Sequence, residues 1–172
     1  MNKIEAYLVG EVVLSVNSDA FSLYEKSHFG EQKGEKIQYS LTEAMFLVER
    51  EKMEIFSKNK KLNQKEFVEK CRKIDKKIQI KYPVFKDLRE RGYVVKTALK
   101  FGADFRVYDR GVKPGEDHAK WVVYPVHEKS ILTWHDFSAK NRVAHSTRKK
   151  LLIGIVDEEA DVTYYQISWI KP

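Results

Sequence analysis

Three residues in the second half of the sequence, Tyr108, His118 and Lys149, have side chains that could act as general base, general acid and cation in one reaction. The surrounding pattern predicts that Tyr108 ends one strand. It predicts that His118 begins the next strand across a flexible loop, and that Lys149 begins a third after a helix. Because strand ends from one sheet can converge at one edge, these three side chains could meet.

The combination suits cleavage of RNA through its own 2′-hydroxyl group. That reaction needs a base for the 2′-hydroxyl proton, an acid for the leaving 5′-oxygen, and positive charge at the pentavalent phosphorane. A histidine, with an ordinary pKa of about 6.5, can serve as the acid at neutral pH. A tyrosine, with an ordinary pKa of about 10, is a poor base unless a cation such as a lysine lowers its pKa. No metal ion or other cofactor is needed.

Residue types alone leave other interpretations open. With nine tyrosines and five histidines, the chain could equally carry a strand-end tyrosine, a loop histidine and the basic surface run 148–150. A metal-dependent nuclease is a further alternative, suggested by a group of acids and a lysine: Asp104, Glu116, Asp117 and Lys120. The spacing argues against it, because Lys120 follows the two nearest acids by three or four residues instead of two. Phosphate-binding glycine loops, HExxH and GxSxG are absent.

The composition is that of a globular chain. Of 172 residues, 42% are hydrophobic and 33% charged, which excludes a disordered or collagenous chain and allows one domain or two small ones. Charges break every apolar run well before the ~18 residues of a membrane-spanning helix. The single cysteine, Cys71, excludes an internal disulfide and a multi-cysteine zinc site. We therefore expect a reduced, cytoplasmic protein without a membrane segment.

The pattern predicts a mixed α/β fold in two domains, residues 1–82 and 83–172. In the first, residues 4–16 read as strands, and the capping box from Ser40 to Glu43 begins a predicted helix of about 15 residues that includes Ile55. A helical stripe follows, which we interpret as core: Phe67, Cys71, Ile74 and Ile78. Pro83 marks the joint between the domains.

The second domain is predicted to be a mixed sheet with helices against it. A short helix over 84–91 precedes strands of period two. The strands are expected at 93–99, 104–108, 119–126, 151–156 and 162–170, with a helix at 133–144 capped by Thr133 and Asp136.

The net charge of +7 is unevenly distributed. Residues 82–172 hold 16 Lys and Arg against 12 Asp and Glu, and a third of these acids form one cluster: Asp157, Glu158, Glu159 and Asp161. This half therefore combines a basic surface with one acidic loop, a distribution compatible with a polyanionic partner.

The sequence from Tyr82 onward resembles the catalytic domain of archaeal tRNA-splicing endonucleases. The resemblance is carried by four stretches: YPVFKDLRERGYVVKTALKFGADFRVY, HAKWVV, RVAHSTRKKLLIGIVD and DVTYYQISW. It implies a small N-terminal scaffold and assembly domain (1–82) and a catalytic domain (83–172). It also implies precursor tRNA as substrate, cut at both ends of an intron folded as a bulge–helix–bulge, with 2′,3′-cyclic phosphate and 5′-hydroxyl ends.

The resemblance implies residue roles as well. Tyr108 would be the general base, His118 the general acid and Lys149 the phosphorane stabiliser. Arg142 would sandwich a bulged base with a second side chain, for which Trp169 is the candidate. A noncatalytic RNA-binding subunit of the same complex is the main alternative, but such subunits lack members of this triad.

The resemblance further implies a homotetramer. Two chains would pair through their C-terminal strands, and the pairs would dock when the acidic loop of one chain enters a basic groove on another. Asp157, Glu158, Glu159 and Asp161 match that loop in position and charge. Such a contact would weaken with salt.

Overall fold

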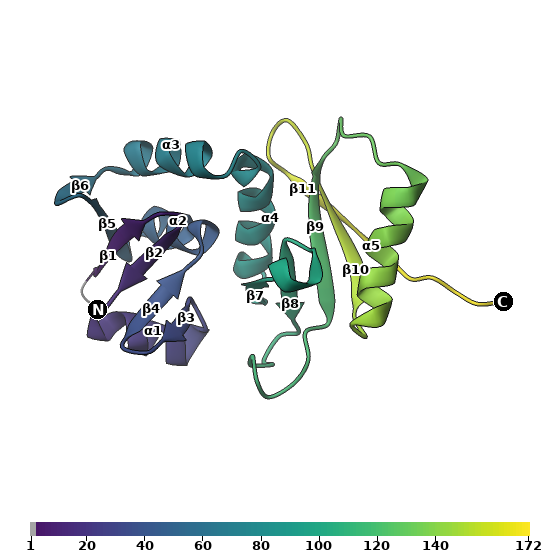
Figure 1. Cartoon of the computed structure of the whole chain (residues 1–172), viewed down its shortest axis with the longest axis horizontal. Coiled ribbons are helices and arrows are strands. Elements are labelled where there is room, and N and C mark those ends of the chain that lie inside the picture. Colours follow the sequence, from purple (N-terminus) through teal and green to yellow (C-terminus); the bar gives the residue numbers. More distant parts are fainter. Residues whose placement is uncertain (1–2) are drawn as a thin grey trace. The chain divides into compact units, whose positions relative to one another are not determined.

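The computed structural model describes residues 3–172, and in it the chain divides into two units, one ending at Tyr82 and the other beginning at Pro83 (Figure 1). Helix α4 (Ile78–Glu90) runs across this division. Within residues 3–172, no helix is both long and apolar enough to cross a membrane.

Within the described part of the first unit, six strands form one sheet in the order β3-β4-β2-β1-β5-β6. Its strands are β1 (Ile4–Val9), β2 (Val12–Ser15), β3 (Glu31–Lys33), β4 (Lys36–Tyr39), β5 (Met53–Ser57) and β6 (Lys60–Leu62). Its helices are α1 (Ser18–Ser27), α2 (Leu41–Glu49) and α3 (Gln64–Ile74). β1 and β5 pair in parallel, and the other neighbours are antiparallel.

The capping box predicted at Ser40 begins α2. The Ser40 side chain accepts the Glu43 N–H, and the Glu43 side chain accepts the Ser40 N–H. The predicted helix length was wrong, since α2 ends at Glu49. Glu51 adopts a left-handed backbone conformation (φ 56°), which breaks the helix. Ile55 then belongs to β5, where it is buried in alternation with its neighbours.

The helical stripe predicted at residues 67–78 is split between two helices. Phe67 and Cys71 are buried on α3, whereas Ile78 is buried at the first residue of α4. Burial raises the pKa of the Cys71 thiol to about 12, which makes it a poor nucleophile at neutral pH.

In residues 83–172, all of which are described, five strands form a mixed sheet in the order β11-β10-β9-β8-β7. They are β7 (Val94–Thr97), β8 (Phe105–Tyr108), β9 (Trp121–His127), β10 (Lys150–Val156) and β11 (Val162–Ile167). β9 and β10 are parallel, while the other neighbours are antiparallel. A 3₁₀ turn (Leu99–Phe101) follows β7, and α5 (Trp134–Ser146) follows β9. The predicted mixed α/β class is confirmed.

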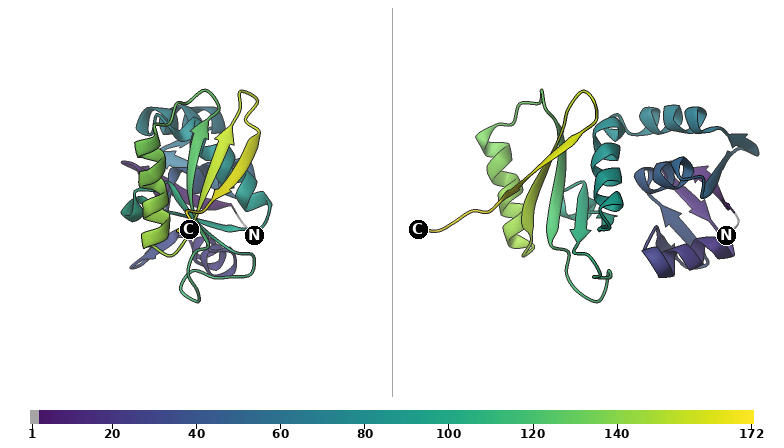
Figure 2. Two further views of the ribbon diagram at one scale, coloured as in Figure 1. Left: turned by 90° about the vertical axis from the view of Figure 1, so that its right-hand side faces the viewer. Right: turned by 180° about the vertical axis from the view of Figure 1, so that it is seen from behind.

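Helices cover both faces of this second sheet (Figures 1 and 2). On one face, Ala144 of α5 joins a core with Val122, Leu151 and Ile153. On the other, α4 packs so closely that a Cβ at Gly154 would lie 3.1 Å from a Val84 methyl group. The site residues therefore stand on a sheet held from both sides.

Pro83 lies inside α4 and does not precede a separate helix as predicted. A proline removes one backbone hydrogen bond but its fixed φ is compatible with helix. The turn that follows buries Val84, Phe85 and Leu88, and this packing offsets the lost bond.

Candidate active site

Three strand ends meet at one edge of the second sheet because of its pairing register. Trp121, at the start of β9, pairs with Val107 of antiparallel β8 and with Lys150 of parallel β10. The preceding residue, Lys120, bridges both neighbours: its N–H donates to the Val107 carbonyl at 2.8 Å, and its carbonyl accepts from the Lys150 N–H at 2.9 Å. The end of β8 and the starts of β9 and β10 are thereby aligned.

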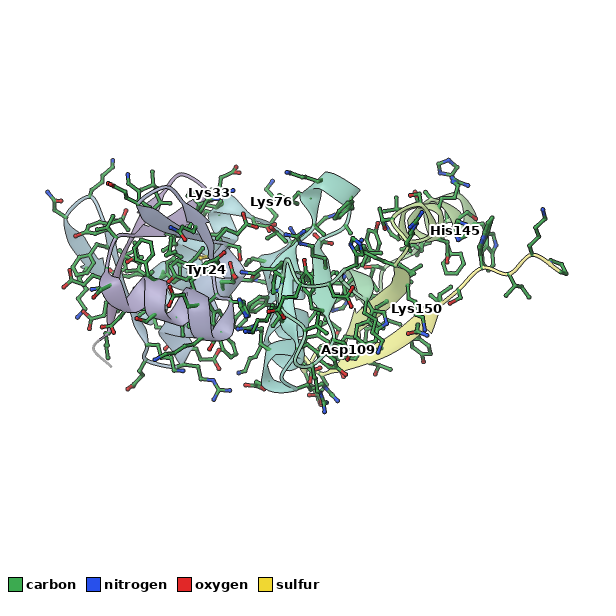
Figure 3. All side chains as sticks on the ribbon, turned by 90° about the horizontal axis from the view of Figure 1, so that it is seen from below. Tyr24, Lys33, Lys76, Asp109, His145 and Lys150 are labelled. Atoms are coloured by element: carbon green, nitrogen blue, oxygen red, sulfur yellow. The ribbon has the colours of Figure 1, made fainter. Side chains whose placement is uncertain are left out.

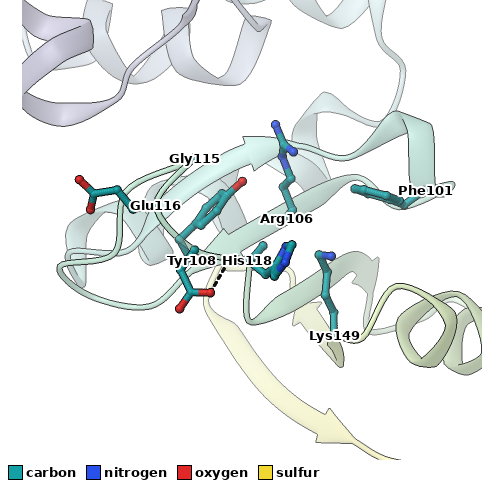
Figure 4. A pocket seen from close by; sticks show the side chains of 9 residues that line it. Phe101, Arg106, Tyr108, Gly115, Glu116, His118 and Lys149 are labelled. Atoms are coloured by element: carbon teal, nitrogen blue, oxygen red, sulfur yellow. Dashed lines mark hydrogen bonds between the residues drawn. The ribbon is translucent and has the colours of Figure 1, made fainter.

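This alignment brings the three candidate residues to one pocket of about 350 Å³ (Figure 4). Tyr108 follows Val107, Lys149 precedes Lys150, and His118 lies just before β9. The walls of the pocket are formed by Phe101, Arg106, Tyr108, Gly115, Glu116, Asp117, His118, Ala119 and Lys149. Side chains separated by up to 48 positions in the sequence are thus neighbours in space.

Lys149 is placed by the C-terminal cap of α5. The Lys149 N–H donates to the Ala144 carbonyl at 2.8 Å, and the Arg148 N–H donates to the His145 carbonyl at 3.0 Å. With Arg148 in the left-handed region (φ 55°), these two bonds make a Schellman motif. The motif turns the chain sharply from α5 into β10, so the position of Lys149 is fixed by a helix end and a strand start together.

The Lys149 ammonium group is held by neutral partners. Its Nζ donates to the Thr147 carbonyl at 2.9 Å and lies 5.0 Å from the centroid of the Phe101 ring. Partial burial lowers the pKa of Lys149 below its ordinary value, and the positive charge of Arg106 lowers it further. An anion that enters the pocket would therefore stabilise the charged form of Lys149.

Tyr108 is only 5% exposed at the end of β8, where Arg106 projects from the same face two residues earlier. The Arg106 guanidinium carbon is 5.9 Å from the centroid of the Tyr108 ring. Sequence reasoning missed Arg106 and Phe101 as pocket residues. The period of two in Phe-Arg-Val-Tyr could have identified Arg106, whereas no local signal pointed to Phe101.

His118 is exposed at the end of the loop that connects β8 to β9. Its backbone N–H donates to the Asp117 carboxylate at 2.6 Å, and the next residue, Ala119, is buried. The loop is thus anchored immediately after His118, while the imidazole faces the pocket (Figure 4).

The acids and lysine considered for a metal-dependent nuclease have other partners here. The Lys120 ammonium pairs with Asp109 at 2.7 Å, and Asp117 accepts the His118 N–H. Among residues 3–172, no group of three or more His, Cys, Asp or Glu side chains is arranged to hold a metal ion.

Arg142 and Trp169 lie away from this site, on a second pocket of about 570 Å³ between α5 and the segment after β11. Trp169 is 52% exposed, and the centroid of its ring is 4.4 Å from that of His145. Figure 3 shows His145 on α5 beside the C-terminal segment. The structure thus places Arg142 and Trp169 on one pocket, and it adds His145 as a contact of Trp169 that sequence reasoning missed.

The acidic cluster forms the turn between β10 and β11. The Asp157 carboxylate accepts the N–H groups of Glu159 and Asp161, each at 2.9 Å, and so stabilises the turn itself. Glu158 pairs with Lys129. In residues 83–172, all described, the carboxylates of Glu159 and Asp161 make no ion pair.

Comparison with known proteins identifies both units. Residues 78–164 match the profile of the tRNA intron endonuclease catalytic C-terminal domain, and residues 4–68 match that of its N-terminal domain. The chain belongs to the tRNA intron endonuclease family. The predicted family resemblance is therefore confirmed, and this endonuclease is an RNA-cleaving enzyme.

Curated relatives match most or nearly all of the chain. The tRNA-splicing endonuclease of Thermococcus kodakarensis is 46% identical over 96% of this chain and 97% of its own. That of Methanothermobacter thermautotrophicus is 40% identical over 99% of both chains. That of Nanoarchaeum equitans is 46% identical over 77% of this chain and 88% of its own. The similarity extends over both units of this endonuclease.

The environment of Lys149 gives the first prediction. Replacing Phe101 with Ala opens the ammonium group to water, so the pKa of Lys149 should rise toward its ordinary value. NMR titration of ¹³C-methylated lysines measures this pKa, and a Lys149→Arg variant assigns the signal. Leu99→Ala is the matched control, because Leu99 lies exposed on the same 3₁₀ turn. Equal pKa values in the two variants would show that Phe101 does not shield the Lys149 ammonium group from water.

Proposed function

We propose that this endonuclease cuts precursor tRNA at both intron boundaries within a bulge–helix–bulge, by attack of the 2′-hydroxyl group and without a metal ion. The products are a 2′,3′-cyclic phosphate and a 5′-hydroxyl. The observation that supports this most strongly is the shared pocket of a phenol, an imidazole and an ammonium group, each supplied by a different strand end. These groups are the base, acid and cation that the reaction requires.

Each side chain receives one role. Tyr108, reacting as the phenolate, accepts the 2′-hydroxyl proton as the 2′-oxygen attacks phosphorus. His118, in its protonated form, donates a proton to the 5′-oxygen as its bond to phosphorus breaks. Lys149 stabilises the negative charge of the phosphorane by a charge-assisted hydrogen bond. After cleavage Tyr108 holds one proton more and His118 one fewer, and proton exchange with water restores both; the net change in the RNA is the transfer of one proton from the 2′- to the 5′-oxygen.

The family assignment favours an active subunit, and we propose that residues 83–172 carry catalysis while residues 1–82 act as a scaffold and assembly domain. All three triad positions are occupied by their expected residue types, which argues against the noncatalytic RNA-binding subunit considered as an alternative.

The decisive test is single-turnover cleavage of a bulge–helix–bulge RNA in EDTA, with analysis of the product ends. The wild-type protein should cut at full rate and yield cyclic phosphate and 5′-hydroxyl ends. His118→Ala should slow cleavage by about 10²–10⁴-fold, because the leaving oxygen loses its acid, while RNA binding persists. His135→Ala is the matched control, since His135 is exposed on α5 and lines neither pocket.

Two outcomes would refute the proposal. Ends carrying 3′-hydroxyl and 5′-phosphate would exclude attack by the 2′-hydroxyl. Loss of activity in EDTA, restored by Mg²⁺, would favour the metal-dependent alternative.

We further propose that Arg142 and Trp169 sandwich a base of the bulge. Both line the second pocket, and a guanidinium plane and an indole ring each stack on any base. The contact between Trp169 and His145 holds the indole against α5, so the stacking surface is partly ordered before RNA binds.

The stacking pair is tested by an abasic bulge. Trp169→Ala should weaken binding of the intact RNA by roughly 5- to 100-fold, the loss expected for one stacked base. It should have little effect on an RNA whose bulged nucleotide lacks its base. Trp134→Ala is the control, because Trp134 is also exposed but lies outside the second pocket. Equal losses with intact and abasic RNA would remove Trp169 from base stacking.

For assembly we propose a tetramer formed as a dimer of dimers. β11 is the edge strand of the second sheet and exposes 56% of Tyr165, which suits pairing of two chains through their C-terminal strands. The turn of Asp157, Glu158, Glu159 and Asp161 would dock the pairs. Because Asp157 supports the turn and Glu158 pairs with Lys129, we assign docking chiefly to Glu159 and Asp161.

Charge reversal tests this assignment. The double substitution E159K/D161K should convert tetramers to dimers in sedimentation velocity, because both carboxylates would then repel a basic groove. Raising the salt concentration should weaken the wild-type tetramer in the same direction. E11K/E35K changes the net charge equally, on exposed residues of the first unit, and should leave the mass unchanged. A tetramer that survives E159K/D161K would contradict docking through this turn.

A further inference from the structure

The active-site pocket holds a second cation, Arg106, to which the proposed reaction assigns no role. Arg106 and Tyr108 extend from the same face of β8 (Figure 4). Arg106 stands on β8, an interior strand of the sheet, whereas His118 lies on the loop before β9.

The charges around this pocket favour an anion between Arg106 and Lys149. The positive charge of Arg106 lowers the pKa of Lys149, so the two cations are close enough to repel each other. Two acids also line the pocket. Asp117 accepts the His118 N–H, and the Glu116 carboxylate points away from both cations in Figure 4. An anionic ligand would relieve the repulsion between Arg106 and Lys149.

We propose that Arg106 is a fourth catalytic residue, which binds a non-bridging oxygen of the scissile phosphate alongside Lys149. This inference rests on the proposed function, because it takes the reacting phosphate to enter this pocket. A guanidinium group suits the task because it stays charged and presents paired N–H donors to phosphate oxygens. The phosphorane carries more negative charge than the starting phosphate, so two fixed cations stabilise it more than one.

The test is a comparison of charged and neutral phosphate at the cut linkage. Two RNAs carry a 2′-deoxy nucleotide before the cut, which prevents cleavage, and one of them also carries a methylphosphonate in place of the scissile phosphate. Dissociation constants are measured in EDTA for the wild type and Arg106→Gln. The methylphosphonate should weaken wild-type binding by about tenfold and Arg106→Gln binding by about threefold or less. A smaller effect in the variant is expected if Arg106 contacts the phosphate charge directly.

Two further variants make the comparison specific. Arg91→Gln removes an arginine of the same unit that pairs with Asp87 outside the pocket, and it should respond to the methylphosphonate as the wild type does. Arg106→Lys keeps the charge but loses the paired donors, so its response should be intermediate. If Arg106→Gln does not fold, the comparison with the wild type is made with Arg106→Lys instead.

Equal weakening by the methylphosphonate in the wild type and in the Arg106 variants would overturn the inference. Cleavage of all-ribose RNA separates this result from failure of the proposed function. A wild-type protein that yields cyclic phosphate ends in EDTA supports that function whatever Arg106 does. On the same RNA, Arg106→Gln should slow single-turnover cleavage by about 10- to 100-fold, and an unchanged rate would also overturn the role of Arg106.

Discussion

The backbone of Lys120 is the point on which the geometry of the pocket depends. Its N–H and carbonyl bond to β8 and β10 on either side, at 2.8 and 2.9 Å. Because β8 runs against β9 while β10 runs with it, one end of β8 and the opposite ends of β9 and β10 lie at the same edge. A register slip of one residue would turn Tyr108 to the other face of the sheet, so this ladder specifies which side chains can meet.

Electrostatics adds a second constraint. Lys149 is placed by the end of α5, where helix carbonyls favour a cation, yet partial burial and the charge of Arg106 both work against its ionised form. The positive charges of the pocket therefore favour binding of an anion. The Schellman motif behind this placement uses Arg148 in a left-handed conformation that usually favours glycine, so local backbone strain accompanies the positioning of Lys149.

Local patterns predicted the positioning elements well, and non-local features poorly. Thr133 caps α5 as expected, and Tyr108 ends its strand, because capping and period-two alternation are properties of short segments. The strand order could not be read from the sequence, since pairing is decided by packing between distant segments. The contact of Phe101 with Lys149 was missed for the same reason. Ile55 was assigned to a helix because its apolar spacing did not reveal the turn at Glu51.

The proposed reaction requires that the side chains of Tyr108, His118 and Lys149 surround one reacting phosphate. A crystal structure of the protein with a bulge–helix–bulge RNA, made uncleavable by 2′-deoxy nucleotides at both cuts, tests it most directly. The scissile phosphate should lie in the pocket, with Lys149 on a non-bridging oxygen, His118 at the 5′-oxygen and Tyr108 at the 2′ position. A scissile phosphate bound elsewhere on the chain, with this pocket empty, would contradict it.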